Sequence, residues 1–204
     1  MSSKRQEKRE PLIIVVSAPS GSGKTTLVSR LLEKMPGIKR SISYTTREPR
    51  ESEKEGEDYI FITKEEFERR IEENDFLEWE KNFNNYYGTS KEQFREAVDK
   101  GEDIVLSIDV KGARRVKNKV PESISVFIMP PSDKELETRL RKRNTDQEQQ
   151  VSMRLKESKA EIASADEYDY LIVNENIEEA TEELRMIIEN ERDNRKSETK
   201  KEEE

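Results

Sequence analysis

The sequence predicts an α/β fold in which a parallel five-stranded sheet forms a core flanked by helices. Short, dense apolar runs recur along the chain, such as residues 12–16 and 124–129, and such runs are typical of strands buried on both faces. Most of the runs are separated by long segments with helical patterns, as the crossovers of a parallel sheet require. The five expected strands are residues 12–17, 40–44, 104–108, 124–129 and 170–173.

Side chains that can cap helices mark several helix starts along the chain. Thr63, Ser90, Ser132 and Thr145 are each followed three residues later by Glu or Gln, which is the capping-box pattern. Asn176 begins a related pattern. The helix expected after it carries apolar residues on one face, as a helix packed on a core does.

The chain is expected to form one domain, residues 11–190, between two charged tails. Residues 1–10 and 191–204 are almost wholly polar and charged, so we expect frayed ends there and disorder in 191–204. Residues 43–92 hold alternating and aromatic-rich runs, which indicate an inserted, mixed β-rich piece. The expected division is a core of 11–42, 93–132 and 164–190, the β-rich insertion 43–92 and an arginine-rich helical segment 133–163.

The composition excludes several classes of function. The 204 residues include no Cys and no His, which excludes a disulfide framework, a thiolate zinc site, a cysteine nucleophile and a Ser-His-Asp triad. The longest aliphatic run is far short of the ~20 residues that span a membrane, and the N-terminus lacks the apolar stretch of a secretory signal. A formal net charge of −8 argues against a broad nucleic-acid surface. We expect a cytoplasmic protein that binds neither nucleic acid nor membrane, and protein partners are not indicated.

A glycine-rich turn follows the first expected strand and opens a helix. Small residues let backbone N–H groups turn inward around a polyphosphate, and the helix N-terminus adds partial positive charge. We expect Lys24 to reach the β and γ phosphates and the Thr25 hydroxyl to join the shell of a Mg²⁺ ion. The alternative is a Gly/Ser-rich turn before an ordinary helix, and Ala18 stands where the general pattern has Gly. The expected nucleotide-binding residues are Ala18, Pro19, Ser20, Gly21, Ser22, Gly23, Lys24, Thr25 and Thr26.

Residues 43–61 form a second candidate phosphate site. The guanidinium groups of Arg47 and Arg50 match phosphate oxygens, and the Tyr59 hydroxyl can complete a socket for a monophosphate. Taken alone, two arginines in an acidic loop are more often solvated surface. The spacing changes this interpretation, because residues 43–61 closely resemble the guanylate kinase family, whose Thr-Thr-Arg motif is followed at set intervals by Arg, an acidic residue, Gly and Tyr-x-Phe.

The resemblance extends over almost the whole chain. The loop Ser-Ala-Pro-Ser-Gly-Ser-Gly-Lys at residues 17–24 is similar to the form found in many bacterial guanylate kinases. Further similar stretches are residues 76–79, 85–88, 108–112, 130–131 and 168–174, so the resemblance covers about residues 12–190. It implies a P-loop NTPase-like core in which the insertion 43–92 binds GMP and the segment 133–163 is a lid.

The resemblance also implies a reaction and the residues that carry it. ATP would phosphorylate GMP to give ADP and GDP, with dGMP as a further acceptor and Mg²⁺ held by Thr25 and Asp109. Whether Asp109 serves magnesium or the guanine base stays open. The implied GMP-binding residues are Ser43, Arg47, Arg50, Glu53, Tyr59, Glu78, Tyr87, Thr89 and Asp109. The implied catalytic residues are Lys24, Arg47, Arg139, Arg143 and Arg154, and Asn174 would join the phosphate loop in binding ATP.

The chemistry of guanine agrees with these roles. Guanine presents N1–H and N2–H₂ side by side, two donors that the carboxylate of Glu78 can accept together, and its O6 can accept from the Thr89 hydroxyl. Adenine has a bare N1 acceptor at the same edge, which the carboxylate would repel. Without the resemblance, an exposed acid beside Trp79 would be the favoured interpretation of Glu78.

Four positions depart from the family pattern, and two rival functions remain. Ser107 and Lys111 stand where the family commonly has an acid and Gln, and Lys142 and Asn144 stand where it usually has Gly. The rivals are a catalytically silent interaction module of guanylate-kinase type and a phosphate-loop kinase for another small acceptor. An intact Lys24 argues against the first, and the Thr-Thr-Arg motif argues against the second.

Overall fold

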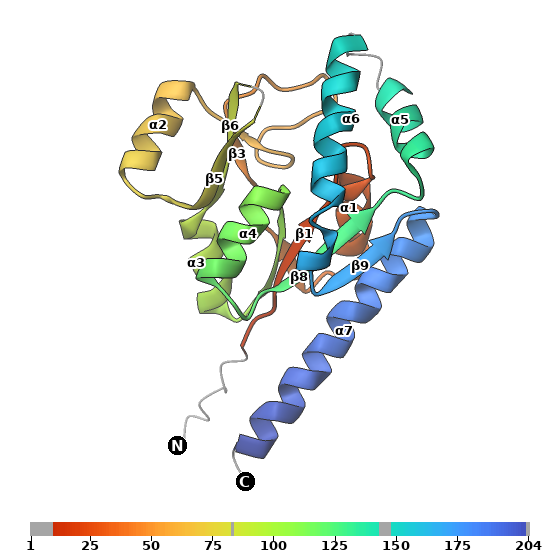
Figure 1. The fold of residues 1–204 in the computed structure, drawn as a ribbon. Coiled ribbons are helices and arrows are strands. Elements are labelled where there is room, and N and C mark those ends of the chain that lie inside the picture. Colours follow the sequence, from red (N-terminus) through yellow and green to blue (C-terminus); the bar gives the residue numbers. More distant parts are fainter. Residues whose placement is uncertain (1–9, 83, 143–147, 203–204) are drawn as a thin grey trace.

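The computed structural model describes residues 10–82, 84–142 and 148–202, and its centre is a five-stranded sheet (Figure 1). The strand order is β2-β7-β1-β8-β9, and every neighbouring pair is parallel. The predicted parallel core is therefore confirmed. Its strands are β1 (Ile13–Ser17), β2 (Ile38–Arg40), β7 (Asp103–Ser107), β8 (Ile124–Met129) and β9 (Tyr170–Val173).

Helices cover both faces of this sheet, because alternate residues of β1 point to opposite sides. Ile14 and Val16 pack in one apolar cluster with residues of α1 (Lys24–Lys34) and α7 (Ile177–Glu202). Ile13 and Val15 pack in another cluster with residues of α3 (Lys91–Lys100) and α4 (Val110–Lys119). The central strand is thus buried on both faces, as its uninterrupted apolar sequence predicts.

The expected strand at residues 40–44 is wrong, because the chain changes sheets within it. β2 ends at Arg40, and the backbone N–H of Ser41 still donates to the carbonyl of Val105. The side-chain amide of Gln93 then forms hydrogen bonds with both backbone groups of Ile42. It accepts from the N–H at 2.8 Å and donates to the carbonyl at 3.1 Å. This amide replaces a strand partner, so the next strand, β3 (Tyr44–Thr45), joins a different sheet.

The second sheet is the mixed, β-rich insertion that the sequence predicts. Its order is β4-β3-β6-β5, in which β3 and β4 are parallel and the other neighbours antiparallel. Phe67 of α2 (Lys64–Glu72) is fully buried and stacks on Phe76 and Tyr86, which attaches the helix to this sheet. In Figure 1 the insertion lies beside the central sheet, on the side away from α5 and α6. Its remaining strands are β4 (Ile60–Phe61), β5 (Phe76–Asn82) and β6 (Asn85–Ser90).

Four of the five predicted helix caps are present. The hydroxyls of Thr63, Ser90 and Ser132 each accept a backbone N–H of the first turn, and the side chain of Asn176 does the same. Thr145 lies outside the described residues. The arginine-rich segment contains α5 (Asp133–Lys142) and α6 (Glu148–Ile162), followed by the short 3₁₀ helix η1 (Ala165–Glu167).

The predicted disordered C-terminal tail is wrong for residues 191–202, because α7 continues through them. Arg192 donates at 2.7 Å to the buried carboxylate of Asp103, and Arg195 donates at 2.7 Å to the carbonyl of Glu122. These contacts with distant residues hold the polar end of the helix on the core. Despite its 26 residues α7 is highly charged, and no helix in the described part of the chain is apolar enough over a sufficient length to cross a bilayer.

Candidate functional site

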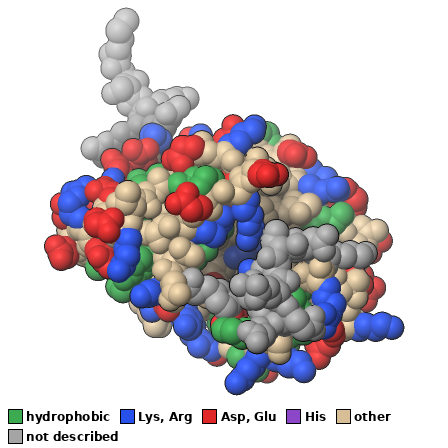
Figure 2. Space-filling model, turned by 90° about the horizontal axis from the view of Figure 1, so that it is seen from above, with side chains coloured by type: hydrophobic (Ala, Val, Ile, Leu, Met, Phe, Trp, Pro, Cys, Tyr) green, Lys and Arg blue, Asp and Glu red, His purple; other side chains and the backbone are tan. Residues whose placement is uncertain are grey.

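A cavity of about 460 Å³ opens at the carboxyl ends of the central strands, where α/β sheets commonly bind ligands. It lies between the turn that follows β1 and the second sheet, and α6 contributes one side chain, Glu161. Figure 2 looks down on this face and shows Lys and Arg side chains gathered around a hollow near its middle.

The turn between β1 and α1 has the backbone of a phosphate loop. Gly21 and Gly23 have φ of +92° and +89°, a region that other residues rarely adopt. A Cβ at Gly23 would lie 2.5 Å from the side-chain nitrogen of Asn174, which donates at 2.7 Å to the carbonyl of Ser22. Asn174 therefore supports the loop from beneath. Ala18, at the variant position, is buried in the adjoining core, so this position is filled without strain.

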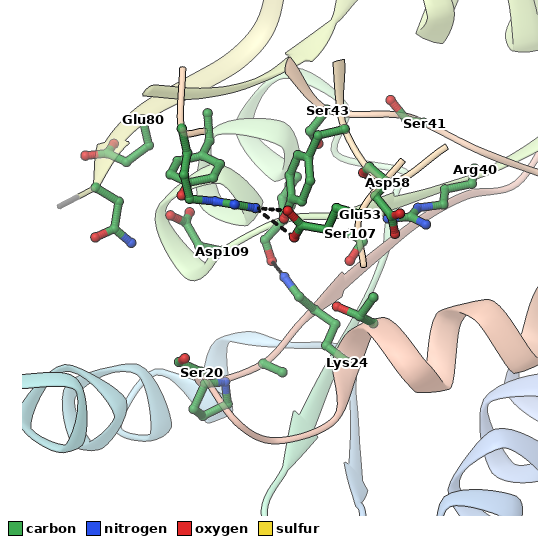
Figure 3. Close-up of a pocket in the computed structure, with 18 of the residues that line it drawn as sticks. Ser20, Lys24, Arg40, Ser41, Ser43, Glu53, Asp58, Glu80, Ser107 and Asp109 are labelled. Atoms are coloured by element: carbon green, nitrogen blue, oxygen red, sulfur yellow. Dashed lines mark hydrogen bonds and ion pairs between the residues drawn. The ribbon is translucent and has the colours of Figure 1, made fainter. Parts of the chain in front are cut away.

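Lys24 begins α1 and points into the cavity (Figure 3). Its ammonium donates at 2.6 Å to the carbonyl of Ile108, the residue that follows β7. Burial lowers the pKa of Lys24, although the charges of Asp109 and Glu161 act against the lowering. The ammonium is thus partly desolvated and held by a neutral oxygen, which suits it to bind an anion.

Across the cavity, the predicted monophosphate residues form one cluster. One terminal nitrogen of Arg47 donates to both carboxylate oxygens of Glu53, at 2.8 and 2.9 Å, and the guanidinium lies 5.5 Å from the ring centre of Tyr59. The backbone N–H of Arg50 donates to the same carboxylate, and the ring of Tyr87 packs edge-on against Tyr59. Burial raises the pKa of Tyr59, so its hydroxyl keeps its proton and can donate to a phosphate oxygen.

Deeper in the cavity lies the predicted base-reading pair. Glu78 of β5 is only 5% exposed, and its carboxylate accepts from the Thr89 hydroxyl of β6 at 2.6 Å. Burial raises the pKa of Glu78 to about 7, with the Thr89 hydrogen bond acting against this and the charge of Asp109 adding to it. Thr89 itself does not line the cavity in this structure, because its hydroxyl is turned to Glu78 rather than to a ligand.

Thr25 and Asp109 supply oxygen atoms near Lys24 that suit Mg²⁺. Both residues line the cavity, and one carboxylate oxygen of Asp109 caps α4 by accepting the Gly112 N–H at 2.8 Å. No group of three or more Asp or Glu side chains in the described segments is arranged to hold a metal by itself. One hydroxyl and one carboxylate fit the usual magnesium site of kinases, in which water and substrate phosphates complete the shell.

Most, but not all, of the predicted site residues meet in this cavity. Arg139 and Asn174 line a second hollow on the other side of the phosphate loop, together with Gly21 and Gly23. Arg154 lines neither of the two cavities, and Arg143 lies outside the described residues. The predicted residues that line the main cavity are Ala18, Pro19, Ser20, Gly21, Gly23, Lys24, Thr25, Thr26, Ser43, Arg47, Arg50, Glu53, Tyr59, Glu78, Tyr87 and Asp109.

Several lining residues were missed by the sequence argument, among them Arg40, Asp58, Glu80 and Glu161. Glu161 lies in the last turn of α6, and burial raises its pKa to about 7, although the charge of Lys24 and the backbone N–H of Ser20 act against this. No motif marks these residues. Arg40 lies at the carboxyl end of β2, but the sequence predicted a strand that begins at this residue, so its position in the expected strand gave no signal.

A phosphate loop facing an arginine cluster and a buried carboxylate is the arrangement of a phosphate-loop kinase for a small phosphorylated acceptor. Sequence comparison identifies the family within this class. A guanylate kinase family model matches residues 9–191, and the chain belongs to the guanylate kinase family.

Individual relatives support this assignment. The chain is 45% identical over 181 residues to a guanylate kinase of Caldanaerobacter subterraneus subsp. tengcongensis, covering 89% of this chain and 88% of the relative. It is 49% identical over 178 residues to a guanylate kinase of Fusobacterium nucleatum, covering 87% and 96%. The crystal structure of guanylate kinase from Anaplasma phagocytophilum superposes with a TM-score of 0.76 at 37% identity, covering 91% of this chain and 88% of that one.

Proposed function

We propose that the protein catalyses transfer of the γ-phosphoryl group of ATP to GMP, giving ADP and GDP. The observation that carries the proposal is the placement of Glu78 in the same cavity as Lys24 and Arg47. The first residue suits a guanine edge, and the other two suit a donor and an acceptor phosphate. We place the reaction in the cytoplasm.

The residue roles follow from which groups meet in the cavity. GMP is held by its phosphate at Arg47, Arg50, Tyr59 and Tyr87, with Glu53 fixing the two arginines. Its base lies against Ser43, Glu78 and Asp109, and Thr89 orients the Glu78 carboxylate. ATP takes the phosphate loop, residues 18–26, with Asn174 supporting that loop from the second hollow.

In the reaction, an oxygen of the GMP phosphate attacks the γ-phosphorus in line, and the bond to the β–γ bridging oxygen breaks as ADP leaves. The transition state is loose and spreads charge over the γ-oxygens, which Lys24 and Arg47 stabilise. No protein base is needed, because a phosphate monoester with a second pKa near ~6 is mostly ionised at neutral pH. Bound Mg²⁺, held by Thr25 and Asp109, would neutralise phosphate charge.

Nucleotide binding is proposed to close the molecule, with the lid segment 133–163 and the insertion 43–92 both folding toward the core. Arg139 faces the second hollow and Arg154 faces neither cavity, so these arginines need a movement to reach the phosphates. Closure would bring them in and exclude water. Small-angle scattering with a bisubstrate analogue joining adenosine and guanosine should show a smaller radius of gyration than the free protein. An unchanged radius at saturation would argue against the lid.

A coupled assay of ADP release with GMP, AMP, UMP and CMP tests the proposed reaction. GMP should be strongly preferred. Lys24→Ala should keep the fold and lose about 10²–10³-fold in turnover, since it removes an electrostatic contact to the transferring group. Lys34→Ala, at the exposed far end of the same helix, is the matched control and should leave turnover unchanged. A silent interaction module would release no ADP with any acceptor.

A further inference from the structure

The cationic side chains that line the main cavity differ in whether they pair with a carboxylate. Arg47 and Arg50 are both paired with Glu53. In contrast, neither Lys24 nor Arg40 has a carboxylate oxygen within the 4.0 Å ion-pair distance among residues 10–82, 84–142 and 148–202. Lys24 is already explained by the phosphate loop. Arg40 belongs to no motif and has no assigned role.

Arg40 reaches the cavity from the last position of β2, and Figure 3 shows its side chain extending toward Asp58. One terminal nitrogen donates to the backbone carbonyl of Asp58 at 3.3 Å, a long hydrogen bond. Its Nε is buried and has no hydrogen-bond partner in the described part of the protein. The hydroxyl of the next residue, Ser41, is likewise buried without a partner there. A buried guanidinium nitrogen left in this way is costly unless a ligand satisfies it.

The residues around Arg40 indicate which chemical group of a ligand would satisfy its buried nitrogen. The carbonyl that Arg40 contacts belongs to the residue before Tyr59, whose hydroxyl lies in the proposed monophosphate cluster. The positive charge of Arg40 lowers the pKa of both Lys24 and Tyr59, although burial raises the pKa of Tyr59 overall. Arg40 therefore acts electrostatically on both the donor and the acceptor side of the cavity, and a phosphate is the group that both sides are built to bind.

We propose that Arg40 is a further phosphate-binding residue, which contacts the monophosphate of the acceptor together with Arg47. When the acceptor binds, the Arg40 guanidinium gains the charged partner that it lacks among the described residues, and its contact with Asp58 keeps it beside Tyr59. This inference rests on the proposed function, because it takes GMP as the acceptor.

The test compares GMP with guanosine, which has the same base and sugar but no phosphate. Calorimetry on the full chain gives the affinity for each ligand, and their ratio isolates the phosphate contribution. Arg40→Gln should weaken GMP binding about 10-fold or more, as loss of a charge-assisted hydrogen bond does, and change guanosine binding by about 2-fold or less. Lys39→Gln is the matched control. It removes the same charge from the neighbouring residue, which is exposed and pairs with Glu102, and it should change neither affinity.

Three outcomes would overturn the inference. An unchanged affinity for GMP would mean that Arg40 does not touch the phosphate. Equal losses for GMP and guanosine would give it a purely structural role. A loss of ATP affinity without a loss of GMP affinity would place it on the donor side. Should Arg40→Gln not fold, Arg40→Met keeps the apolar stem and provides the same ratio. Failure of the unaltered protein to bind GMP would contradict the proposed function instead, so the two failures are distinguishable.

Discussion

The Thr89 hydroxyl donates a hydrogen bond of 2.6 Å to one carboxylate oxygen of Glu78, and both side chains are buried. The other oxygen faces Gly112, where an added Cβ would lie 2.7 Å away. The carboxylate is thus held by a hydrogen bond from β6, and it lies against the first turn of α4, where there is no room for a side chain. A fixed acceptor selects ligands by their donor pattern, and this has consequences for specificity, pH dependence and tolerance of substitution.

The first prediction is that Glu78 discriminates guanine from adenine. Glu78→Gln replaces one acceptor oxygen with a donor, which opposes N1–H or N2–H₂ of guanine but can serve the bare N1 of adenine. Sites built around buried polar partners reject mismatched ligands strongly. We expect kcat/KM for GMP to fall by at least ~100-fold, about 2.7 kcal/mol, with a smaller loss or none for AMP. An unchanged GMP-to-AMP preference in a folded variant would move base reading to Ser43 or Asp109.

The family resemblance pointed to both residues of this pair, because the motifs that contain them are local and keep their spacing, but the hydrogen bond between them was not predicted. The central strands were predictable for a similar reason, since burial on both faces leaves a continuous apolar run, as in β8. Such signals fail where a distant residue decides the structure. Gln93 lies 51 positions from Ile42 and ends the pairing there, which no property of residues 40–44 reveals.

The dependence on distant parts of the chain also explains why Glu161 and Arg40 were not predicted as site residues. Glu161 belongs to the end of α6, and it lies in the cavity because that helix packs over the phosphate loop. Arg40 lies at the end of a short edge strand whose boundary was itself displaced in the prediction. Neither residue is part of a spaced motif, so only the fold shows that they share a cavity with Lys24.

The raised pKa of Glu78, about 7, predicts pH-dependent binding of the base. Only the ionised carboxylate accepts both guanine donors, so affinity is highest well above pH 7 and falls as the pH drops through 7. Guanosine should bind about 10-fold more weakly at pH 6 than at pH 8, as follows for a single site of pKa near 7. Guanosine is used because the phosphate of GMP titrates near pH ~6.

Two variants test whether Glu78 or Glu161, whose pKa is also raised, causes this pH dependence. Glu78→Gln should flatten the guanosine profile between pH 6 and pH 8. Glu161→Gln should leave it unchanged, because Glu161 lies at the phosphate loop near Ser20 and Lys24. If the profile flattens only in Glu161→Gln, then Glu161, at the phosphate end of the cavity, causes the pH dependence.

The contact between Gly112 and Glu78 gives a third prediction. Gly112→Ala places a methyl group 2.7 Å from the carboxylate oxygen and 3.3 Å from the Asp109 carboxylate, so one or both must shift. The side chain of Glu78 can move more easily than the helix, and the Thr89 hydrogen bond is then lost or bent. We expect kcat/KM for GMP to fall about 10-fold or more while the protein stays folded, because small displacements of a positioning group have large effects on rate.

Gly37→Ala is the matched control for this substitution. Gly37 has an ordinary φ, and nothing lies within 4 Å of an added Cβ, so activity should not change. Steady-state kinetics with GMP at fixed, saturating ATP measures both variants. Wild-type kinetics in Gly112→Ala would show that the carboxylate is not held against this turn.

The end of α7 provides a prediction about stability. Asp103 is 1% exposed, and one carboxylate oxygen accepts the Leu12 N–H at 2.8 Å while the other accepts Arg192 Nε at 2.7 Å. Arg192→Ala deprives a buried carboxylate of this cation, and removing one partner of such a pair costs up to about 3–5 kcal/mol. Because Arg192 keeps 20% of its side chain exposed, we expect the free energy of unfolding, measured with urea, to fall by about 2 kcal/mol.

Lys196→Ala, on the same helix but exposed, is the control and should lower the free energy of unfolding by under about 0.5 kcal/mol. Equal losses in the two variants would mean that the ion pair does not anchor the helix, and residues 191–202 would then add little to the stability of the fold.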